Sequence, residues 1–305
     1  MTQLQIMNLC VDQTLHDLLY VNVRSMMPAD CPREVLGVRD RFQADVRPSS
    51  NHHTNPTMAS PHASLLTHHL LALSQPSFDA ATQHPFLHAA GTGTLPKHAL
   101  SAWLSQDRLY AQSYIRFIGL LLSKTRLPSS QTTQSSLQWR ITDMLIEALT
   151  NIRREIQLFE KTAADYELDL QTPWEGQESF EMTNVTRGYV DLFMSAAGPG
   201  TSLLEGLVVL WATEKCYFEA WTYAGRLRLE GNLKQGDGAD GGVLGKELIP
   251  NWTSAEFAAF VGTIGGLVDE LGKVEGVMEN DEERRRCEEV WRQVLWLEER
   301  FWPVS

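Results

Sequence analysis

The stretch SLLEGLVVLWATEKCYFEAWTYAGRLRLE, residues 202–230, is the most apolar long segment of the chain. Its hydrophobic side chains recur three and four residues apart, which is the spacing of one face of an α-helix. GPG at 198–200 is a strong helix stop before it, and GNLKQGDGADGG follows it at 231–242. We therefore expect one long helix between two connections. The second connection lacks the preceding strand and the lysine that complete a phosphate-binding loop, so we interpret it as a mobile loop.

The same periodicity continues outward from this stretch in both directions. It begins near Ala63, and Pro96 stands where a long helix could start. Ser254 and Asp281 are the expected N-caps of the last two helices, since early acids that suit the helix dipole follow each of them. No run keeps the period of two that is typical of a strand. The pattern predicts an all-α bundle of six or seven long helices. Besides 202–230, the long helical stretches are 100–124, 136–170, 184–197, 254–274 and 281–302.

The composition is that of a globular protein, with 43% hydrophobic and 21% charged residues. A net charge of −12 argues against nucleic acid or an anionic membrane as the main partner. No segment approaches the roughly 20 apolar residues that a membrane helix needs, and the N-terminus does not resemble a secretion signal. The 4 cysteines show no CxxC spacing, so we interpret them as reduced thiols. These features predict a cytoplasmic protein.

The first 57 residues differ from the rest of the chain. They mix short apolar runs with RPSSNHHTNPT at 47–57, which has neither helix nor strand periodicity. We predict a poorly ordered extension over 1–57 and a helical domain over 58–305. Equally, the coding sequence could start at Met58, where a smoother sequence begins.

All 9 histidines lie at or before His98. Residues 99–305 therefore offer no imidazole for general-base work or for metal binding. Any chemistry in this part of the chain has to come from carboxylates, tyrosines, lysines or Cys216.

Several acidic residues lie among aromatic ones on the predicted helix faces. Residues three and four apart share a face, so an acid at that spacing points the same way as its aromatic neighbours. The acids placed in this way, with neighbours on the same face, are Asp107 (Trp103, Tyr110, Tyr114, Phe117), Glu155 (Ile152, Phe159), Glu214 (Leu207, Trp211, Tyr217, Phe218, Trp221) and Glu298 (Trp291, Leu295, Phe301, Trp302).

A carboxylate buried among aromatic side chains is protonated, paired with arginine, hydrogen-bonded to tyrosine, bound to metal or catalytic. The alternative is that each acid lies at the edge of the bundle, in water. A di-iron site would need Glu-x-x-His pairs, but the third residue after each glutamate is Leu158, Tyr217 or Phe301, so we expect no metal. An aromatic pocket with convergent acids suits a flat, nitrogen-rich ring, whose amino groups the carboxylates bind.

Four motifs resemble those of the TenA/thiaminase II family. They are HPFLHAAGTGTLPKHALSAWLSQDRLYAQSY (84–114), TRGYVDLF (186–193), IPNWTSAEF (249–257) and LEERFW (297–302). The resemblance covers about residues 65–305, and the first and last motifs together are fairly specific.

The resemblance implies a haem-oxygenase-like helical bundle without haem or another cofactor. It also implies an aminopyrimidine aminohydrolase that acts on the pyrimidine half of thiamin or its degradation products, and removes the group on the aminomethyl carbon. By match, Asp107 would bind the amino group and ring nitrogen, Tyr110 would support Asp107, Tyr189 would line the pocket, and Glu298 would protonate the leaving amine. The further substrate-binding residues are expected to be Tyr217, Phe218 and Trp252. A homo-oligomer is also expected.

One departure concerns the nucleophile. The bacterial branch of the family has a catalytic cysteine where this chain has Glu214, whereas a second branch, found in plants among others, resembles this chain in having glutamate there. Cys216 lies about 200° around the helix from Glu214, so we interpret it as structural. Glu214 would either activate water or add covalently to the substrate. Leu297 and Trp252 replace tyrosines of the family.

Two other functions compete with hydrolysis. A non-catalytic pyrimidine-binding or regulatory protein could have kept the pocket after losing the cysteine. A cofactorless oxidase like the pyrroloquinoline-quinone-synthesis branch fits poorly, because that branch relies on histidines and basic residues. Release of ammonia from an aminomethylpyrimidine would separate these hypotheses.

Overall fold

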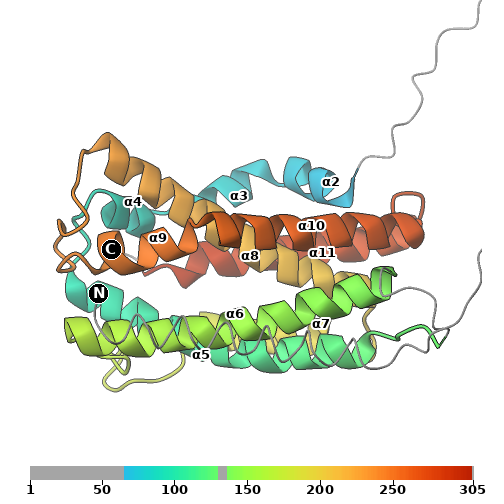
Figure 1. The fold of residues 1–305 in the computed structure, drawn as a ribbon, viewed down its shortest axis with the longest axis horizontal. Helices are drawn as coiled ribbons and strands as arrows, with labels where there is room; N and C mark the ends of the chain where they lie inside the picture. Colours follow the sequence, from blue (N-terminus) through green and yellow to red (C-terminus); the bar gives the residue numbers. More distant parts are fainter. Residues whose placement is uncertain (1–64, 130–135, 304–305) are drawn as a thin grey trace, which may run out of the picture. The chain divides into compact units, whose positions relative to one another are not determined.

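The computed structural model describes residues 65–129 and 136–303, and in these ranges all regular structure is helical (Figure 1). The all-α prediction is therefore confirmed. The predicted boundary between 57 and 58 lies outside the described residues and stays a prediction. The elements are α2 (Leu66–Leu73), α3 (Gln75–Thr82), α4 (Pro85–Gly91), α5 (Lys97–Lys124), α6 (Leu137–Tyr166), α7 (Asn184–Ala196), α8 (Leu203–Glu230), the π-helical turn η1 (Leu244–Leu248), α9 (Ile249–Trp252), α10 (Ala255–Val274) and α11 (Asp281–Phe301).

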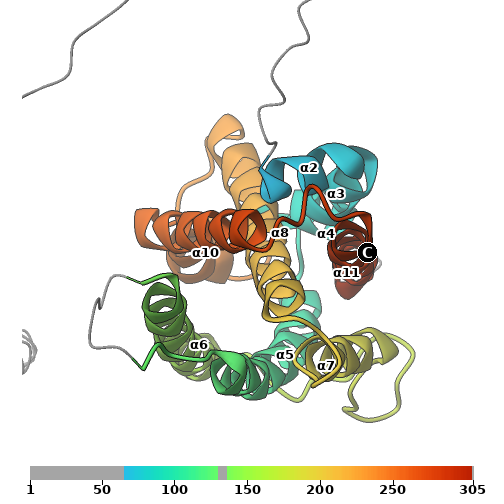
Figure 2. The same cartoon turned by 90° about the vertical axis from the view of Figure 1, so that its right-hand side faces the viewer.

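Helix α8 runs through the middle of the bundle, with α5, α6 and α7 on one side and α10 and α11 on the other (Figures 1 and 2). It packs against α3, α4, α5, α7, α9, α10 and α11. A helix with neighbours on all sides is apolar all round, which explains why 202–230 is the most hydrophobic stretch. A capping box starts it: the Ser202 hydroxyl accepts from the Glu205 amide at 3.0 Å, and Glu205 Oε1 accepts from the Ser202 amide at 2.8 Å.

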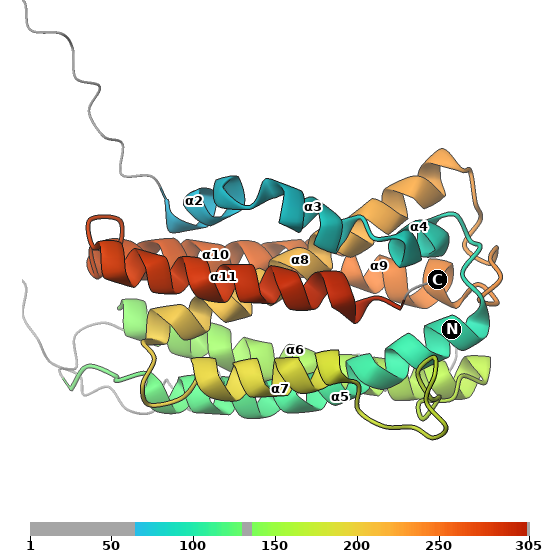
Figure 3. The ribbon, with the colours of Figure 1, turned by 180° about the vertical axis from the view of Figure 1, so that it is seen from behind.

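Seen from behind, α5, α6 and α7 form a layer below α8, α10 and α11, while the short helices α2, α3 and α4 lie along the upper side (Figure 3). Two helix junctions divide the segment before α5. Ser74 separates α2 from α3, and His84 caps α4, its Nδ1 accepting from the Phe86 amide at 3.2 Å. None of the described helices is long and apolar enough to cross a membrane.

Of the two predicted N-caps, Ser254 is confirmed and Asp281 is wrong. Ser254 caps α10, its hydroxyl accepting from the Phe257 amide at 3.2 Å. The cap of α11 is Asn280 rather than Asp281, and its Oδ1 accepts from the amides of Glu282 and Glu283 at 3.1 and 3.3 Å. Asp281 instead joins these glutamates in the first turn, where the helix dipole stabilises acids.

An aromatic cluster at the end of α5 joins helices that are far apart in sequence. The Phe86 ring stacks on Trp302 with centroids 5.7 Å apart, and Trp302 stacks on Trp103 at 5.5 Å. The indole of Trp302 donates to the Ala81 carbonyl at 2.8 Å. The first and last motifs of the chain therefore meet here, and this part of each is core.

The loop over 231–242 is tied to α8. Arg228 is 6% exposed, and its Nη2 donates to the Lys234 carbonyl at 2.8 Å. The Lys234 amide in turn donates to Asp237 Oδ2 at 2.9 Å. This loop, interpreted from sequence as a mobile connection, is thus held by a buried guanidinium.

Candidate active site

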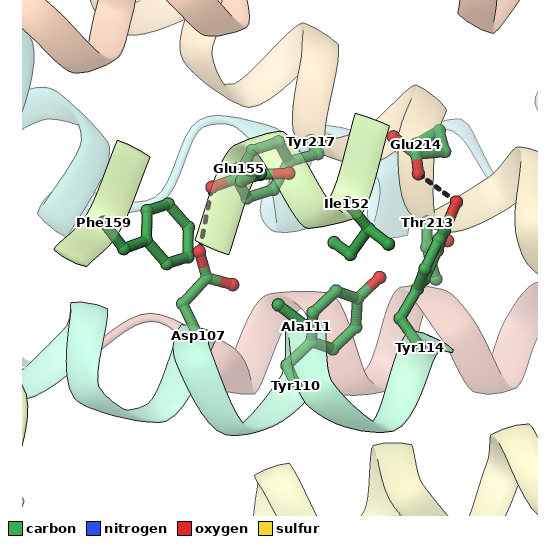
Figure 4. A pocket seen from close by; sticks show the side chains of 10 residues that line it. All are labelled: Asp107, Tyr110, Ala111, Tyr114, Ile152, Glu155, Phe159, Thr213, Glu214 and Tyr217. Atoms are coloured by element: carbon green, nitrogen blue, oxygen red, sulfur yellow. Dashed lines mark hydrogen bonds between the residues drawn. The ribbon is translucent and has the colours of Figure 1, made fainter. Parts of the chain in front are cut away.

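A small cavity, of about 20 Å³, lies between α5, α6 and α8 (Figure 4). We call it the inner cavity. Three of its lining residues are carboxylates, and each comes from a different one of these helices. The lining residues are Asp107, Tyr110, Ala111, Tyr114, Ile152, Glu155, Phe159, Thr213, Glu214 and Tyr217.

Asp107 lies on α5 and is 3% exposed. Its Oδ2 accepts a 3.0 Å hydrogen bond from the hydroxyl of Tyr217 on α8. Burial raises the pKa of Asp107 well above its ordinary value, and the nearby carboxylate of Glu155 adds to this, while the Tyr217 bond opposes it. Burial therefore favours the neutral form of this side chain unless a cation or an N–H donor faces it.

Glu214 on α8 is held from the other direction. The hydroxyl of Tyr114 on α5 donates to Glu214 Oε1 at 2.5 Å. Burial raises the pKa of Glu214 to about 8, although the Tyr114 bond lowers it. Two tyrosine–carboxylate hydrogen bonds therefore join α5 and α8. In one, Tyr217 of α8 donates to Asp107 of α5, and in the other, Tyr114 of α5 donates to Glu214 of α8, so both acids are held in place.

Glu155 on α6 also lines the inner cavity, although sequence reasoning did not include it among the site residues. The indole nitrogen of Trp252 donates to Glu155 Oε1 at 2.8 Å. Burial raises the pKa of Glu155 to about 7. A signal existed in the sequence, since Ile152 and Phe159, the apolar neighbours on its helix face, line the same cavity.

Glu298 and Tyr189 form a pair that lines neither this cavity nor the outer one described next. The Tyr189 hydroxyl donates to Glu298 Oε1 at 2.5 Å, and Glu298 is 4% exposed. Burial raises the pKa of Glu298 to about 8. The Tyr189 ring lies edge-on to Tyr110 with centroids 5.0 Å apart, so the pair stands directly behind the Tyr110 wall of the inner cavity.

A larger outer cavity, of about 390 Å³, adjoins the inner one between α6 and the α9–α10 segment. The two share Tyr114, Ile152, Glu155 and Glu214, so the inner cavity continues into the outer one. Trp252 lines the outer cavity. Phe218 lines neither cavity and packs its ring edge-on against Phe257 at 5.9 Å.

The inner cavity contains no lysine, arginine or histidine among its lining residues. Its carboxylates are consequently either neutral or balanced by a bound cation or by N–H donors of a ligand. In the described part of the chain, no cluster of three or more His, Cys, Asp or Glu side chains is arranged to hold a metal ion.

A family model for the TENA/THI-4/PQQC family matches residues 73–305. The chain belongs to this family. Its fold is accordingly haem-oxygenase-like, as predicted. The solved structure of a TenA homologue from Pyrococcus furiosus matches 78% of the chain and 98% of its own, with 26% identity and a TM-score of 0.61.

Three relatives of this TENA/THI-4/PQQC member carry different descriptions. A probable transcription factor of Fusarium pseudograminearum is 29% identical over 82% of the chain, and the chain spans only 54% of that protein. A probable bifunctional TENA-E protein of Glycine max is 20% identical over 75% of the chain and 87% of its own. An aminopyrimidine aminohydrolase of Halalkalibacterium halodurans is 24% identical over 76% of the chain and 91% of its own.

Cys216 of this family member is fully buried and lines neither cavity. Burial raises the pKa of its thiol well above the ordinary value, so it is not a thiolate at neutral pH. Its position agrees with the half-turn that separates it from Glu214 along α8.

Tyr114, Thr213 and Ala111 also line the inner cavity without having been predicted as site residues. Of these, only Tyr114 carried a signal, because it follows Tyr110 on the aromatic face of α5.

Proposed function

We propose that this chain is an aminopyrimidine aminohydrolase-like hydrolase of thiamin salvage or degradation, which breaks the C–N bond on the aminomethyl carbon of a thiamin-derived pyrimidine. One observation carries the proposal. Asp107, Glu155 and Glu214 line one cavity with aromatic walls and no basic lining residue. A flat ring with several N–H groups satisfies these carboxylates, whereas an anionic substrate would be repelled.

Asp107 binds the ring in this proposal. Its carboxyl group contacts the amino group of the pyrimidine and the adjacent ring nitrogen. A proton shared between Asp107 and that nitrogen makes the ring more electron-withdrawing. The 3.0 Å bond from Tyr217 fixes the orientation of the carboxyl group, and Tyr110 supports the same side of the cavity.

Glu298 protonates the leaving amine. A pKa of about 8 keeps its carboxyl protonated at neutral pH, as a general acid requires, and Tyr189 holds it in one orientation. Because Glu298 lines neither cavity, its proton has to pass the Tyr110 wall, against which the Tyr189 ring packs, to reach the amine. Glu214 either activates water or forms a covalent intermediate with the aminomethyl carbon, in the place of the cysteine of the bacterial branch.

The relatives support this activity unequally. The protein of Halalkalibacterium halodurans carries the name of the proposed activity, at 24% identity. A glutamate at position 214 agrees with membership of the branch that lacks the nucleophilic cysteine, and we propose that branch for this chain.

A non-catalytic pyrimidine-binding or regulatory role is the second candidate. It is favoured by the description of the Fusarium relative as a probable transcription factor. A binding protein would need the same cavity and the same Asp107 contact, but no proton donor.

Incubation of the purified protein with 4-amino-5-aminomethyl-2-methylpyrimidine, with release of ammonia as the readout, tests the proposal. Multiple turnovers are expected. Tight pyrimidine binding without ammonia would favour the regulatory role. Absence of both binding and turnover would contradict a pyrimidine site altogether.

We also propose a cytoplasmic homo-oligomer. Support comes from large apolar side chains that face outward on neighbouring helices, with Ile115 and Leu120 on α5 at 37% and 38% exposed and Ile146 on α6 at 51%. Light scattering should give a mass of at least twice 34.4 kDa. A monomer at micromolar concentration would contradict this proposal.

A further inference from the structure

Glu155 stands where the inner and outer cavities meet. It is one of the residues that line both of them, and it comes from α6, whereas the other shared carboxylate, Glu214, comes from α8. The outer cavity is the larger of the two and shares four lining residues with the inner one, so it offers water a route to the proposed ring site. Glu155 is therefore a carboxylate at the boundary between bulk-accessible water and the proposed ring site.

The hydrogen bond from Trp252 decides which oxygen of Glu155 is available. An indole N–H is a donor only, so Glu155 Oε1 always acts as the acceptor in the 2.8 Å bond. Glu155 Oε2 has no hydrogen-bond partner among residues 65–129 and 136–303 and is not sealed from cavity space. Any proton that Glu155 takes up is thus carried by Oε2.

Glu214 is held differently. Its partner is the hydroxyl of Tyr114, at the short distance of 2.5 Å, and a hydroxyl can accept as well as donate. The pKa of Glu214 is about 8, because of burial, while that of Glu155 is about 7. Only an ionised carboxylate accepts a proton from water, and with a pKa of about 7 a large fraction of Glu155 is ionised at neutral pH.

Trp252 is itself fixed. It is 2% exposed, and its ring contacts Trp103 edge-on at 5.8 Å and Tyr217 at 5.3 Å. A donor held by packing on two sides keeps Glu155 in one rotamer, with the lone pairs of Oε2 in a constant direction.

We propose that Glu155 is a further catalytic residue of this site, the general base that removes a proton from the hydrolytic water. This inference rests on the proposed hydrolase function. The water oxygen bonds to the aminomethyl carbon and its proton moves to Glu155 Oε2, while the C–N bond breaks and the amine leaves with a proton from Glu298. The products are the hydroxymethylpyrimidine and ammonia, and solvent returns both acids to their starting forms. Glu214 then either orients the water or forms an ester that the same water opens.

The decisive variant is Glu155→Gln, which keeps the size of the side chain and the acceptor for Trp252 but cannot take a proton. We expect kcat to fall by about a hundred- to ten-thousandfold, while pyrimidine affinity measured by titration changes by less than about threefold. Glu160→Gln is the matched control, because Glu160 lies on the same helix, is exposed and lines neither cavity. It should leave both constants unchanged.

A pH profile adds a readout that a structural role would not move. Wild-type kcat should rise with pH through an apparent pKa near 7, the value for Glu155, and Glu155→Gln should lose this rise. Trp252→Phe should move it to higher pH, because the Trp252 bond lowers the pKa of Glu155. The other titratable or charged groups facing Glu155 are Asp107, Tyr110 and Tyr114 on α5, Glu214 and Tyr217 on α8, Glu256 on α10, and Glu147 and Arg154 on α6.

Measuring kcat of Glu155→Ala with and without added formate distinguishes loss of the base from loss of the fold. If the small carboxylate restores part of kcat, the variant is folded and the missing group is a base. The inference would be overturned if Glu155→Gln kept kcat within about tenfold of wild type. It would also be overturned if Glu214→Gln, and not Glu155→Gln, lost the rise of kcat with pH. Either result would leave the hydrolase function standing. A wild-type protein that releases no ammonia would overturn both.

Discussion

The hydroxyl of Tyr189 on α7 donates a 2.5 Å hydrogen bond to Glu298 Oε1 on α11, and both side chains are buried behind Tyr110. Because Glu298 is buried and no cationic side chain of residues 65–129 and 136–303 pairs with it, its pKa is raised to about 8, and at neutral pH its carboxyl has a proton to give. The bond fixes the direction of that carboxyl group across two helices.

Glu298→Gln should retain pyrimidine binding and lose turnover. Glutamine fills the same volume and still accepts from Tyr189, yet it cannot deliver a proton, so we expect kcat to fall by about a hundred- to ten-thousandfold. Tyr189→Phe is the companion variant: it leaves the acid in place and should cost less. Steady-state kinetics with a pyrimidine titration measure both. Normal turnover in Glu298→Gln would remove Glu298 from the reaction.

Asp107→Asn should weaken binding and turnover together. It removes the group that contacts the amino group and ring nitrogen, so the affinity for the pyrimidine and kcat/KM should fall by comparable factors, of at least about tenfold. Tyr217→Phe keeps the carboxyl group but loses its 3.0 Å bond, and a smaller decrease is expected. Unchanged affinity in the asparagine variant would show that the ring does not bind at Asp107.

Cys216→Ser should keep most of the activity, since the thiol is fully buried and lines neither cavity. We expect kcat/KM within about threefold of wild type, with a loss of stability of about 1–3 kcal/mol from the buried hydroxyl. A thousandfold loss of activity in a folded variant would mean that Cys216 acts on the substrate.

Stability should fall as the pH rises from 6 to 9. The pKa of Glu298 is about 8 in the folded chain against an ordinary value of 4.5, so the folded state keeps a proton that the unfolded state has lost. By linkage this group alone removes on the order of 2 kcal/mol from the free energy of unfolding across that range. Urea titrations of wild type and Glu298→Gln at pH 6 and 9 measure it, and the variant should lose less. Equal losses would contradict the raised pKa.

Gly91→Ala should destabilise the fold, because a Cβ there would lie 2.6 Å from the Ala224 carbonyl oxygen of α8. We expect a cost of about 1–3 kcal/mol. Gly119→Ala on α5 is the control: nothing lies within 4 Å of its Cβ, so helix propensity should make it slightly stabilising. Urea unfolding compares the two. Equal stabilities would show that α4 is not docked tightly on α8.

The candidate acids were recognisable from sequence for a simple reason. A carboxylate placed three or four residues from aromatic side chains shares their helix face. Asp107 and Glu298 proved to be buried and Glu155 and Glu214 half-buried, each beside an aromatic donor. Phe218 has the same spacing, but α10 covers that part of α8 and brings Phe257 against it instead of a cavity. Spacing alone does not distinguish these two outcomes.

The long helices and the family were recognisable in the sequence, because hydrophobic periodicity and helix stops are local properties and the motifs at 84–114 and 297–302 are continuous in the chain. The place of Glu155 in the cavity wall and that of Glu298 behind it could not be predicted in this way. These positions depend on how the helices cross and rotate, and the bonds that fix them join residues 97 and 109 apart in the chain. Helix periodicity gives the face of each side chain but not the neighbour that the face meets.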